Sequence, residues 1–551
     1  MKKNPIGIED FKIIKEACYY VDKTKLIKFI CDAPDTTVFL FTRPRRFGKS
    51  LALSMLEYYF SNTNNSKSLF EDTYIYKESE YIKYMNSRNV IHLNFKNVDA
   101  SSYDNFIYSM KVLLAEVYNK SIKNSNTNLL SELEINYIND IISLKSNEVE
   151  LKLSLEKLIN IIYLLTNETS IVLIDEYDAP LNEAYKNGFY EKANDFLRLF
   201  LGGALKGNSH LYKAVLTGVT QIAHSSALSD LNNLRVYNVL SPLKDEFFGF
   251  TKEETIDLLN YYNFTGDFND VDKYYGGYSF SINNIYNPWS IFSFIDNNFL
   301  FKNYWANTGS YVLLRDSIKT IADYEIEELS NLLIGDVKII QLDETINFEN
   351  SSLLNQIYTM LVFSGYLTAS LFSEPNNFTV RIPNEEIKSI FKSEIINCYS
   401  NNNFTLLANL KEAFIRGDST KIKDYFNKYV LTCFSYYDLS TEKTYQIIFT
   451  TLLAILFSEA IVKSEVNEGL GRCDIYMRFI DGSYSFVFEL KKLKGRRTEL
   501  ELKKSSIAAL NQIKNKNYYE EALKDNSKKI LIYGVSFSEK KVFTSFEEIK
   551  K

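Results

Sequence analysis

The stretch FTRPRRFGKSLALSML occupies residues 41–56 and follows a short apolar run. Its second half has apolar residues at helical spacing. A strand, a tight turn and a helix N-terminus in this order direct backbone N–H groups at an anion, which is how many nucleotide sites hold phosphate. Gly48-Lys49-Ser50 matches the end of such a loop, although Arg43 stands where a first glycine is usual. The stretch therefore predicts a strand, a phosphate-binding loop and a helix.

Each residue at the end of this loop has a chemical role in the prediction. Gly48 lets the backbone approach the phosphates, Lys49 reaches the β- and γ-phosphates of ATP, and the Ser50 hydroxyl binds Mg²⁺. The predicted nucleotide-binding residues of the loop are Arg45, Arg46, Phe47, Gly48, Lys49 and Ser50. The alternative is a solvated basic turn, because a lone GKS sequence also arises by chance.

Two further apolar segments end in residues that suit the same site. SIVLIDEYDAP, at 170–180, places Asp175 to bind Mg²⁺ and Glu176 to polarise the attacking water. YKAVLTG, at 212–218, ends near Thr217, whose hydroxyl either senses the γ-phosphate or is purely structural. The alternative for the two acids is that they cap the exposed end of a buried strand.

Four strand-like runs alternate with segments of helical period in the first part of the chain. They are TTVFLFT (36–42), NVIHLNF (89–95), SIVLIDE (170–176) and YKAVLTG (212–218). Mostly apolar runs of this kind, with helices between them, are typical of a parallel sheet buried on both faces. The sequence therefore predicts an α/β nucleotide-binding core over residues 1–243.

The pattern changes three times beyond this core. FFGFTKEETIDLLNYY (247–262) reads as a capped helix and introduces a helical lid or accessory subdomain, expected over 244–335. A connector is expected over 336–440, in which residues 353–391 read helix, strand, turn, strand, helix, as in a small winged-helix-like unit. Residues 441–551 predict a second compact α/β domain.

Two neighbouring strands of that domain carry a second candidate site. Asp474 opens one strand, and Glu489 and Lys491 are two residues apart on the next, so they share a face. If the strands pair through the turn at Asp481-Gly482, Asp474 meets Glu489 over one metal ion. Two carboxylates for Mg²⁺ and a lysine to orient water are the ingredients of hydrolytic phosphodiester cleavage. The alternative is an edge strand with alternating charges.

Segments around these strands extend the prediction. A helix is expected over 442–461, and either Glu442 or Glu465 is available as an additional metal ligand. The basic turn KKLKGRR (491–497) either holds a nucleic-acid phosphate backbone or is simply solvated.

Five segments carry a resemblance to a known family. They are YYVDKTKLI (19–27), FLFTRPRRFGKSLALSML (39–56), IVLIDEYDAPL (171–181), LTGVTQIAHSSALSDLNNLRV (216–236) and YNPWSIFSF (286–294). The chain resembles predicted AAA-ATPase-like proteins that often carry a C-terminal PD-(D/E)xK nuclease domain. This resemblance implies an ATPase core of the additional-strand class, in which Lys49, Ser50, Asp175 and Glu176 match the nucleotide residues and an arginine-proline opening replaces the first glycine. Gln221 departs from the basic residue often found there.

The C-terminal segment resembles the PD-(D/E)xK core, where helix, three-stranded sheet, helix and strand recur and a glutamine on the later helix, here Gln512, supports the site. The resemblance implies an ATP-binding and ATP-hydrolysing protein coupled to a Mg²⁺-dependent nuclease acting on DNA, with RNA as the other nucleic acid, in mobile-element or defence biology. The alternative is a nucleotide-switched regulatory or binding protein whose nuclease-like domain is inactive. A homo-oligomer is compatible with either.

Bulk composition limits the remaining classes. The 551 residues are 46% hydrophobic and 24% charged, as in globular multidomain proteins, and the net charge of −6 argues against a uniformly basic coat. Five cysteines without a CxxC pair predict reduced thiols and a cytoplasmic protein. The N-terminus lacks the apolar core of a signal peptide, and the longest apolar run is too short to span a bilayer, so no membrane partner is expected.

Overall fold

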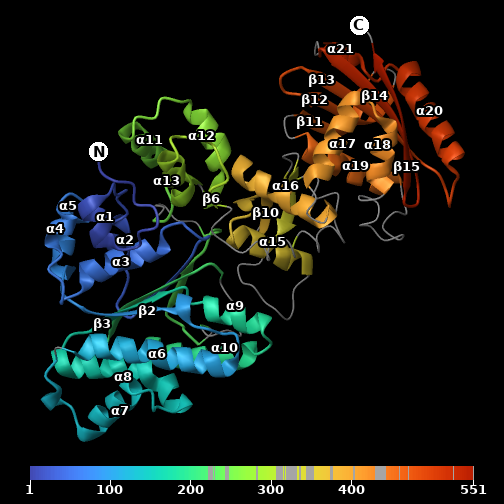
Figure 1. Ribbon diagram of the computed structural model, residues 1–551. Helices are drawn as coiled ribbons and strands as arrows, with labels where there is room; N and C mark the ends of the chain where they lie inside the picture. The colour runs from blue at the N-terminus through green and yellow to red at the C-terminus, as the bar shows by residue number, and fades with distance from the viewer. Residues whose placement is uncertain are drawn as a thin grey trace. The chain divides into compact units, whose positions relative to one another are not determined.

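The computed structural model divides the chain into two compact units, which are described separately (Figure 1). The first comprises Met1–Gly309 and Ile339–Glu386, and the second comprises Ser310–Lys338 and Ile387–Lys551. The structure describes residues 1–123, 125–220, 228, 230–241, 247–280, 283–305, 314, 317, 332–333, 337–342, 353–372, 376–400, 404–427, 442–457, 460–468, 471–524 and 527–549.

The strands are named in chain order. They are β1 (Val38–Thr42), β2 (Asn89–Asn94), β3 (Ser170–Asp175), β4 (Leu211–Gly218), β5 (Leu234–Tyr237), β6 (Tyr278–Phe280), β7 (Asn283–Ile285), β8 (Lys338–Gln341), β9 (Thr368–Leu371), β10 (Asn377–Arg381), β11 (Ala460–Glu468), β12 (Gly471–Phe479), β13 (Tyr484–Lys492), β14 (Lys529–Ser538) and β15 (Lys541–Ile549).

The helices follow the same convention. They are α1 (Phe11–Ala17), α2 (Lys25–Cys31), α3 (Lys49–Phe60), α4 (Lys67–Phe70), α5 (Tyr74–Lys77), α6 (Tyr103–Ile122), α7 (Glu132–Ile142), α8 (Glu148–Thr166), α9 (Ala179–Lys186), α10 (Tyr190–Leu205), α11 (Lys252–Tyr261), α12 (Phe268–Tyr275), α13 (Pro288–Asp296), α15 (Leu353–Phe363), α16 (Glu385–Ser400), α17 (Phe404–Arg416), α18 (Ser419–Tyr425), α19 (Glu442–Leu456), α20 (Glu499–Asn515) and α21 (Glu520–Lys524). Short 3-10 turns are η1 (Ser79–Tyr84), η2 (Phe95–Asn97) and η3 (Thr127–Leu129).

The first unit is built around a five-stranded sheet in the order β2-β3-β4-β1-β5. All neighbouring strands of this sheet pair in parallel. Strand β4 lies between β1 and β3, which confirms the predicted additional-strand arrangement. Because parallel strands end at the same edge, this order brings the ends of β1, β3 and β4 together, with Thr42 paired to Gly218.

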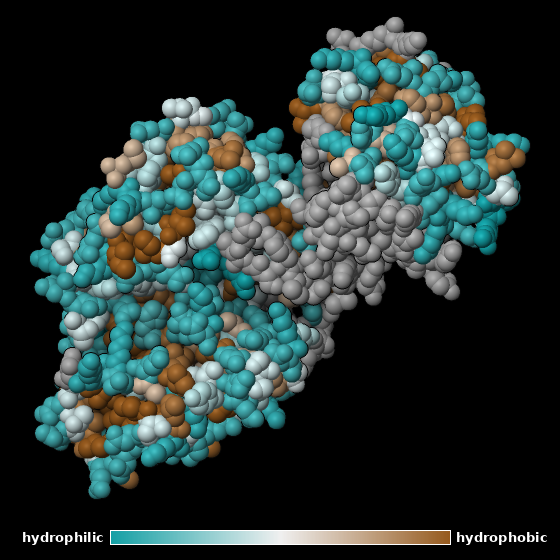
Figure 2. Space-filling view, in the orientation of Figure 1, coloured by the Kyte–Doolittle hydropathy of each residue, from teal (hydrophilic) through white to brown (hydrophobic). Residues whose placement is uncertain are grey.

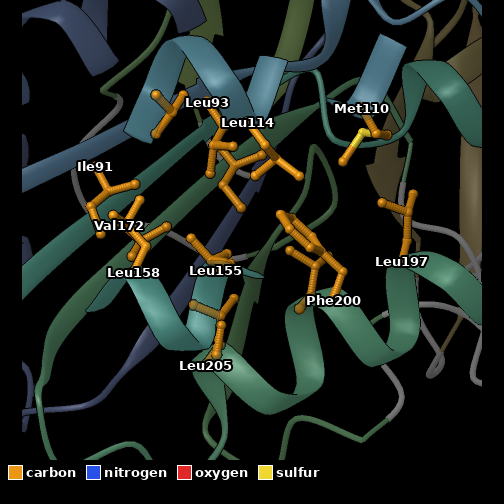
Figure 3. Close-up of a cluster of buried hydrophobic side chains, with 14 of the residues drawn as sticks. Ile91, Leu93, Met110, Leu114, Leu155, Leu158, Val172, Leu197, Phe200 and Leu205 are labelled. Carbon is orange, nitrogen blue, oxygen red and sulfur yellow. The ribbon is translucent and has the colours of Figure 1, made fainter. Parts of the chain in front are cut away.

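Helices cover both faces of this sheet, which explains why every residue of β1, β3 and β4 is buried. Figure 1 shows α3 with α1 and α2 on one face and α6, α8 and α10 on the other. Figure 3 shows the hydrophobic core between the sheet and helices α6, α8 and α10. The residues labelled there are Ile91, Leu93, Met110, Leu114, Leu155, Leu158, Val172, Leu197, Phe200 and Leu205. Fully burying one such side chain stabilises the fold by about 1.5–3 kcal/mol, so this interface holds the helices on the sheet.

The remainder of the first unit packs helices beside short strands. Thr251 and Glu254 form a capping box at the start of α11, the helix predicted by its sequence. Helix α13 starts at Pro288, and the Asn287 side chain caps it. A three-stranded sheet in the order β8-β10-β9 follows. The order α15, β9, β10, α16 is the helix, strand, strand, helix succession expected for residues 353–391.

The second unit contains a mixed five-stranded sheet in the order β11-β12-β13-β14-β15. Strand β14 runs parallel to β13, and the other neighbours are antiparallel. The period of two divides the residues of β13 between two cores, since Phe486 and Phe488 pack with α17 and α19, whereas Val487 packs with α20. This succession of helix, three strands, helix and strand is the arrangement predicted for residues 441–551.

A glycine sets the distance between α20 and this sheet. A Cβ atom on Gly534 of β14 would lie 2.0 Å from the Ser506 carbonyl oxygen and 2.5 Å from the Leu510 nitrogen. Gly534 also pairs with Glu489 in the β13–β14 register. The missing side chain therefore lets α20 lie directly on the strand beside Glu489.

Hydrophilic side chains cover most of the face seen in Figure 2, with apolar patches between them over α6, α7 and α8. Leu133 and Val149, near the first turns of α7 and α8, are among the exposed apolar residues. Within the parts of the chain that are described, no helix is both long and apolar enough to cross a membrane.

We expect Gly534→Ala to destabilise the second unit by about 1–3 kcal/mol or more, because the new methyl group overlaps the backbone of α20. Amide hydrogen exchange in β14 and α20, together with thermal unfolding, measures the effect. The control is Gly202→Ala in α10, where a Cβ meets nothing within 4 Å and helix propensity favours alanine. Unchanged exchange in α20 of the Gly534 variant would contradict this account.

Candidate nucleotide site and candidate metal site

The loop between β1 and α3 is a tight turn with two left-handed residues. Gly48 immediately precedes α3 and has φ of 86°, which glycine adopts without steric cost. Arg46 has φ of 68°, a conformation that costs a residue with a Cβ roughly 1–2 kcal/mol. The first N–H groups of α3 lack intrahelical acceptors, so the turn offers donors to an anion.

Lys49 lies inside this loop. Its Nζ donates hydrogen bonds to the carbonyl oxygens of Arg43, at 2.8 Å, and Pro44, at 2.9 Å. The side chain is buried, and burial lowers its pKa to about 8 although the charge of Asp175 acts in the opposite direction. A buried ammonium held only by two carbonyl groups is well placed to exchange them for phosphate oxygens.

The Asp175 carboxylate connects two other predicted residues, Ser50 and Thr217. The Ser50 hydroxyl donates to Oδ2 at 2.6 Å, and the Thr217 hydroxyl donates to Oδ1 at 2.5 Å. Asp175 and Thr217 are buried at the ends of β3 and β4, and Ser50 comes from the first turn of α3. The additional-strand order therefore gathers a carboxylate and two hydroxyl groups, the oxygen ligands that suit Mg²⁺.

Glu176 follows directly at the end of β3 in a left-handed conformation with φ of 51°. Its backbone N–H donates to Asp175 Oδ1 at 3.1 Å. Burial, and then the charge of Asp175, raise the pKa of the Glu176 carboxyl. A carboxyl with a raised pKa at a strand end matches the predicted role of polarising a water molecule.

The other predicted loop residues lie on its outer side. Arg45 and Arg46 are exposed, and the Arg46 guanidinium stacks over the ring of Trp289 at 4.5 Å. The Phe47 ring is fully buried and packs against Tyr278 and Phe280 at 5.2 and 5.1 Å between ring centroids. The structure thus brings Lys49, Ser50, Asp175 and Thr217 together, while the Arg46 and Phe47 side chains contact the accessory part of the unit.

Polar contacts also reach the loop backbone from that accessory part. The Arg45 carbonyl oxygen accepts hydrogen bonds from Asn287 Nδ2 at 3.4 Å and from Trp305 Nε1 at 3.3 Å. The Phe47 carbonyl oxygen accepts one from the Gly249 N–H at 3.0 Å. Residues far from the loop in sequence therefore contact its backbone at two carbonyl groups.

Glu386, at the start of α16, is a buried carboxylate beside these contacts. It accepts hydrogen bonds from the Ser290 hydroxyl at 2.8 Å and from the Trp305 N–H at 2.7 Å. Burial raises its pKa to about 7, against the effect of these donors.

Asp178 fixes the chain after β4. It accepts hydrogen bonds from the backbone N–H groups of Val219 and Thr220 and from the Thr220 hydroxyl. Gln221, the predicted departure from the family pattern, lies outside the described residues.

A largely apolar pocket adjoins the loop and was missed by sequence reasoning. Its lining residues come from the N-terminal segment, from the loop and α3, and from the accessory part of the first unit. They are Pro5, Ile14, Tyr19, Tyr20, Val21, Lys23, Phe47, Gly48, Leu51, Ala52, Met55, Phe247, Gly249, Phe250, Pro288 and Phe292. Since these segments are far apart in sequence, no local pattern indicates the pocket.

In the second unit, β12 and β13 pair as predicted. Ile475 is opposite Phe488 in this antiparallel pair. Asp474 precedes Ile475 and Glu489 follows Phe488, so the two acids come next to this pair, one on each strand. Asp474 Oδ2 accepts a hydrogen bond from the Leu490 N–H at 2.6 Å. The two carboxylates therefore lie at the same end of the hairpin.

Glu489 is the buried acid of this site. Its Oε1 accepts hydrogen bonds from Lys491 Nζ at 2.8 Å and from Gln512 Nε2, whereas its buried Oε2 has no hydrogen-bond partner among the residues that the structure describes. Burial raises the Glu489 pKa to about 7, and Asp474 adds to this effect. Burial alone would lower the Lys491 pKa, but the Glu489 hydrogen bond and charge raise it.

These residues fit a divalent cation. A buried carboxylate oxygen without a partner is costly, and a bound cation would satisfy it. In the described part of the chain no three His, Cys, Asp or Glu side chains are gathered as a metal centre. Mg²⁺ commonly uses one or two carboxylates and takes its other ligands from water and phosphate, so Asp474 and Glu489 suffice.

Of the two candidate additional ligands, Glu442 is placed by the structure. This first residue of α19 accepts a hydrogen bond from the Lys492 N–H at 2.8 Å, and its charge contributes to raising the pKa of Glu489. Glu465 lies in β11, and its side chain is outside the described set. Gln446, one turn along α19, donates to the Asp474 carbonyl oxygen at 3.0 Å.

The basic turn after β13 is exposed from Lys494 to Arg497. Gly495 is left-handed, with φ of 66°, and Arg497 pairs with Glu501 at 3.2 Å. The turn begins at Lys491, two residues after Glu489, so its positive side chains follow that carboxylate closely in sequence.

Comparisons with known proteins identify the two domains that contain these candidate sites. Residues 5–228 match a family described as predicted AAA-ATPase, and residues 440–547 match the PD-(D/E)XK nuclease superfamily. The chain therefore contains a predicted AAA-ATPase-like domain and a C-terminal PD-(D/E)XK nuclease superfamily domain, as its sequence resemblance indicated. It is also similar to an uncharacterized protein in the vnfD 5' region of Azotobacter chroococcum mcd 1, with 25% identity over 404 residues that cover 72% of this chain and 70% of that protein.

Glu386 should make stability depend on pH. Because burial raises its pKa from 4.5 to about 7, the folded chain retains a proton that the unfolded chain loses between these values. We expect this contribution, on the order of 3 kcal/mol, to be complete below pH 4.5 and lost as pH rises through 7. Denaturant unfolding across this range measures it.

Glu386→Gln should remove this pH dependence, and the neighbouring Glu385→Gln is the control. Parallel stability curves for wild type and Glu386→Gln between pH 4.5 and 7.5 would contradict the assignment.

Proposed function

We propose that this chain binds and hydrolyses ATP and that its C-terminal domain is a Mg²⁺-dependent nuclease acting on DNA, the two activities being coupled. The observation that carries the proposal is the Asp175 carboxylate, which accepts hydrogen bonds from Ser50 and Thr217 beside the buried Lys49. The nuclease half is supported by Glu489 Oε2, which is buried without a hydrogen-bond partner among the described residues. Asp474 lies on the paired strand at the same end of the hairpin.

In the nucleotide site, each residue has a proposed role. Lys49 binds the β- and γ-phosphates, and Ser50 and Asp175 hold Mg²⁺, which when bound neutralises phosphate charge. Glu176 orients the attacking water and accepts its proton. Thr217 fixes the Asp175 carboxylate through its hydrogen bond.

The apolar pocket beside Gly48 is the proposed site for the adenine base. It adjoins the same loop that would hold the phosphates, and tyrosine and phenylalanine rings line it. Flat aromatic and aliphatic walls suit a planar base, and the few polar groups of such pockets select among ligands. This placement favours a nucleotide over a simple phosphate ester.

In the second site, Asp474 and Glu489 would hold Mg²⁺, which supplies charge for the phosphodiester and lowers the pKa of the attacking water. Lys491 would orient that water or stabilise the developing negative charge. Gln512 holds Glu489 through its amide hydrogen bond. The basic turn of residues 491–497 would contact the nucleic-acid backbone without reading its sequence.

A nucleotide-switched regulatory protein is the second candidate. The observation that favours it is the pairing of Lys491 with Glu489 Oε1 at 2.8 Å, which occupies both groups in the absence of a metal ion, while the raised pKa of Glu489 disfavours its ionised form. In that case the domain binds DNA or a partner without cleavage. Mobile-element or defence biology, in the cytoplasm, is the proposed setting for either function, by analogy with other two-domain proteins of this kind.

Lys49→Ala tests the nucleotide site. Removal of a charged group that contacts phosphate should weaken ATP binding at least about tenfold. Isothermal titration with Mg²⁺ and ATP measures the affinity. The matched control is Lys120→Ala, which removes an exposed lysine of α6. Equal affinity of wild type and Lys49→Ala would reject the loop assignment.

Cleavage assays with single- and double-stranded DNA, with Mg²⁺ or Mn²⁺ and with or without ATP, test the nuclease. Asp474→Asn should abolish cleavage, while the exposed turn variant Asp481→Ala should retain it. Loss of any ATP effect in Lys49→Ala would establish coupling. Failure of folded, ATP-binding wild type to cleave under every condition would instead favour the nucleotide-switched protein.

A further inference from the structure

The phosphate loop is held in an uncommon way. Its opening has arginine and proline in place of a glycine, and Arg46 is left-handed at φ 68°. A strained residue with a Cβ persists only where its surroundings over-determine the backbone. The contacts that could do so come from residues 249–305, because Arg46 stacks on Trp289 and Phe47 packs among Tyr278 and Phe280.

Two donors meet on one carbonyl group immediately before Arg46. The Arg45 carbonyl oxygen accepts from Asn287 Nδ2 and from Trp305 Nε1, residues that are 242 and 260 positions away in the chain. These hydrogen bonds fix the orientation of the Arg45–Arg46 peptide group. That peptide determines the direction in which the following residues, up to Gly48, enter α3.

Asn287 links this carbonyl to a helix. Its Oδ1 accepts the N–H groups of Trp289, at 2.9 Å, and Ser290, at 3.4 Å, so the same side chain caps α13 and holds the loop. Such a double role needs an amide, since a carboxylate keeps the acceptor but loses the donor.

Glu386 ties the two donors to each other. Its carboxyl group accepts hydrogen bonds from the hydroxyl of Ser290, in the first turn of the helix that Asn287 caps, and from the backbone N–H of Trp305. Trp305 is also buried against Tyr366 at 5.0 Å between ring centroids. The donors to Arg45 are therefore rigidly placed.

We propose that Asn287 and Trp305 are positioning residues for the phosphate loop and replace, by long-range hydrogen bonds, the conformational control that a first glycine supplies elsewhere. The inference rests on the proposed nucleotide site. Neither side chain contacts phosphate in this account; both act through the Arg45 carbonyl. Their loss should therefore weaken ATP binding even in variants that remain folded.

Asn287→Asp and Trp305→Phe test the proposal in the full-length chain. The first keeps the cap of α13 and removes the donor, and the second keeps an aromatic ring and removes the indole N–H. We expect ATP affinity to fall about five- to tenfold in each, from the loss of one or more hydrogen bonds. Because both side chains are buried, melting temperatures should fall by a few degrees, and the affinities are compared well below the lowest of them. Asn147→Asp, at the capped start of α8, is the matched control and should change neither quantity.

Tryptophan fluorescence gives a second readout that a purely structural role would not move. The chain has two tryptophans, and both contact the loop. In Trp289→Phe the remaining Trp305 should change its emission when ATP is added, and Asn287→Asp combined with Trp289→Phe should reduce that change. An emission from Trp305 that ignores saturating ATP would overturn the proposal.

The outcomes separate this inference from the proposed function. If wild type does not bind ATP, the nucleotide site itself fails. If wild type binds, Lys49→Ala does not, and both positioning variants bind like wild type, only the positioning role fails. Should Asn287→Asp not fold, wild-type affinity in Trp305→Phe is sufficient to overturn it.

Discussion

The Asp175 carboxylate imposes the constraint on which the first unit depends. It accepts hydrogen bonds from Ser50 and Thr217, so the start of α3 and the ends of β3 and β4 must converge at one edge of the sheet. A parallel sheet with β4 between β1 and β3 satisfies this requirement, because all strand ends then lie at the same edge. A buried carboxylate without these donors would be strongly disfavoured, so the site and the strand order support each other.

The sheet was predictable because its signals are local. VFLF and SIVLID are apolar runs of strand length, each followed by chemistry-bearing residues, and both became fully buried parallel strands. Sequence proximity did not indicate the groups that complete the loop, since Asn287 and Trp305 reach Arg45 from more than 240 positions away. In sequence, Asn287 reads only as the cap of a helix that begins with proline. Its second hydrogen bond follows from tertiary packing, which no local pattern encodes.

The same distinction applies to the second unit. Asp474 and Glu489 are joined by a short turn, and a period of two is enough to place them at one end of a hairpin. Glu442 is 50 positions from Lys492, whose N–H it contacts, so its place beside β13 depends on the packing of α19 against the sheet. Gln512 reaches Glu489 because Gly534 lets α20 lie on β14, a close approach that the amino-acid pattern of neither element reveals.

Replacement of a glycine by arginine and proline changes where the loop conformation is determined. A glycine-rich loop adopts its shape because glycine allows many backbone conformations. In this loop Pro44 restricts its own φ, and Arg46 holds a left-handed conformation that is costly for a residue with a Cβ. The energy that keeps Arg46 in this state must come from other parts of the unit, here the aromatic packing of Phe47 and the donors on the Arg45 carbonyl. A loop shaped in this way cannot change conformation without disturbing α13 and Trp305. If the loop binds phosphate as proposed, that binding would be energetically linked to the packing of the accessory segment through contacts within a single unit.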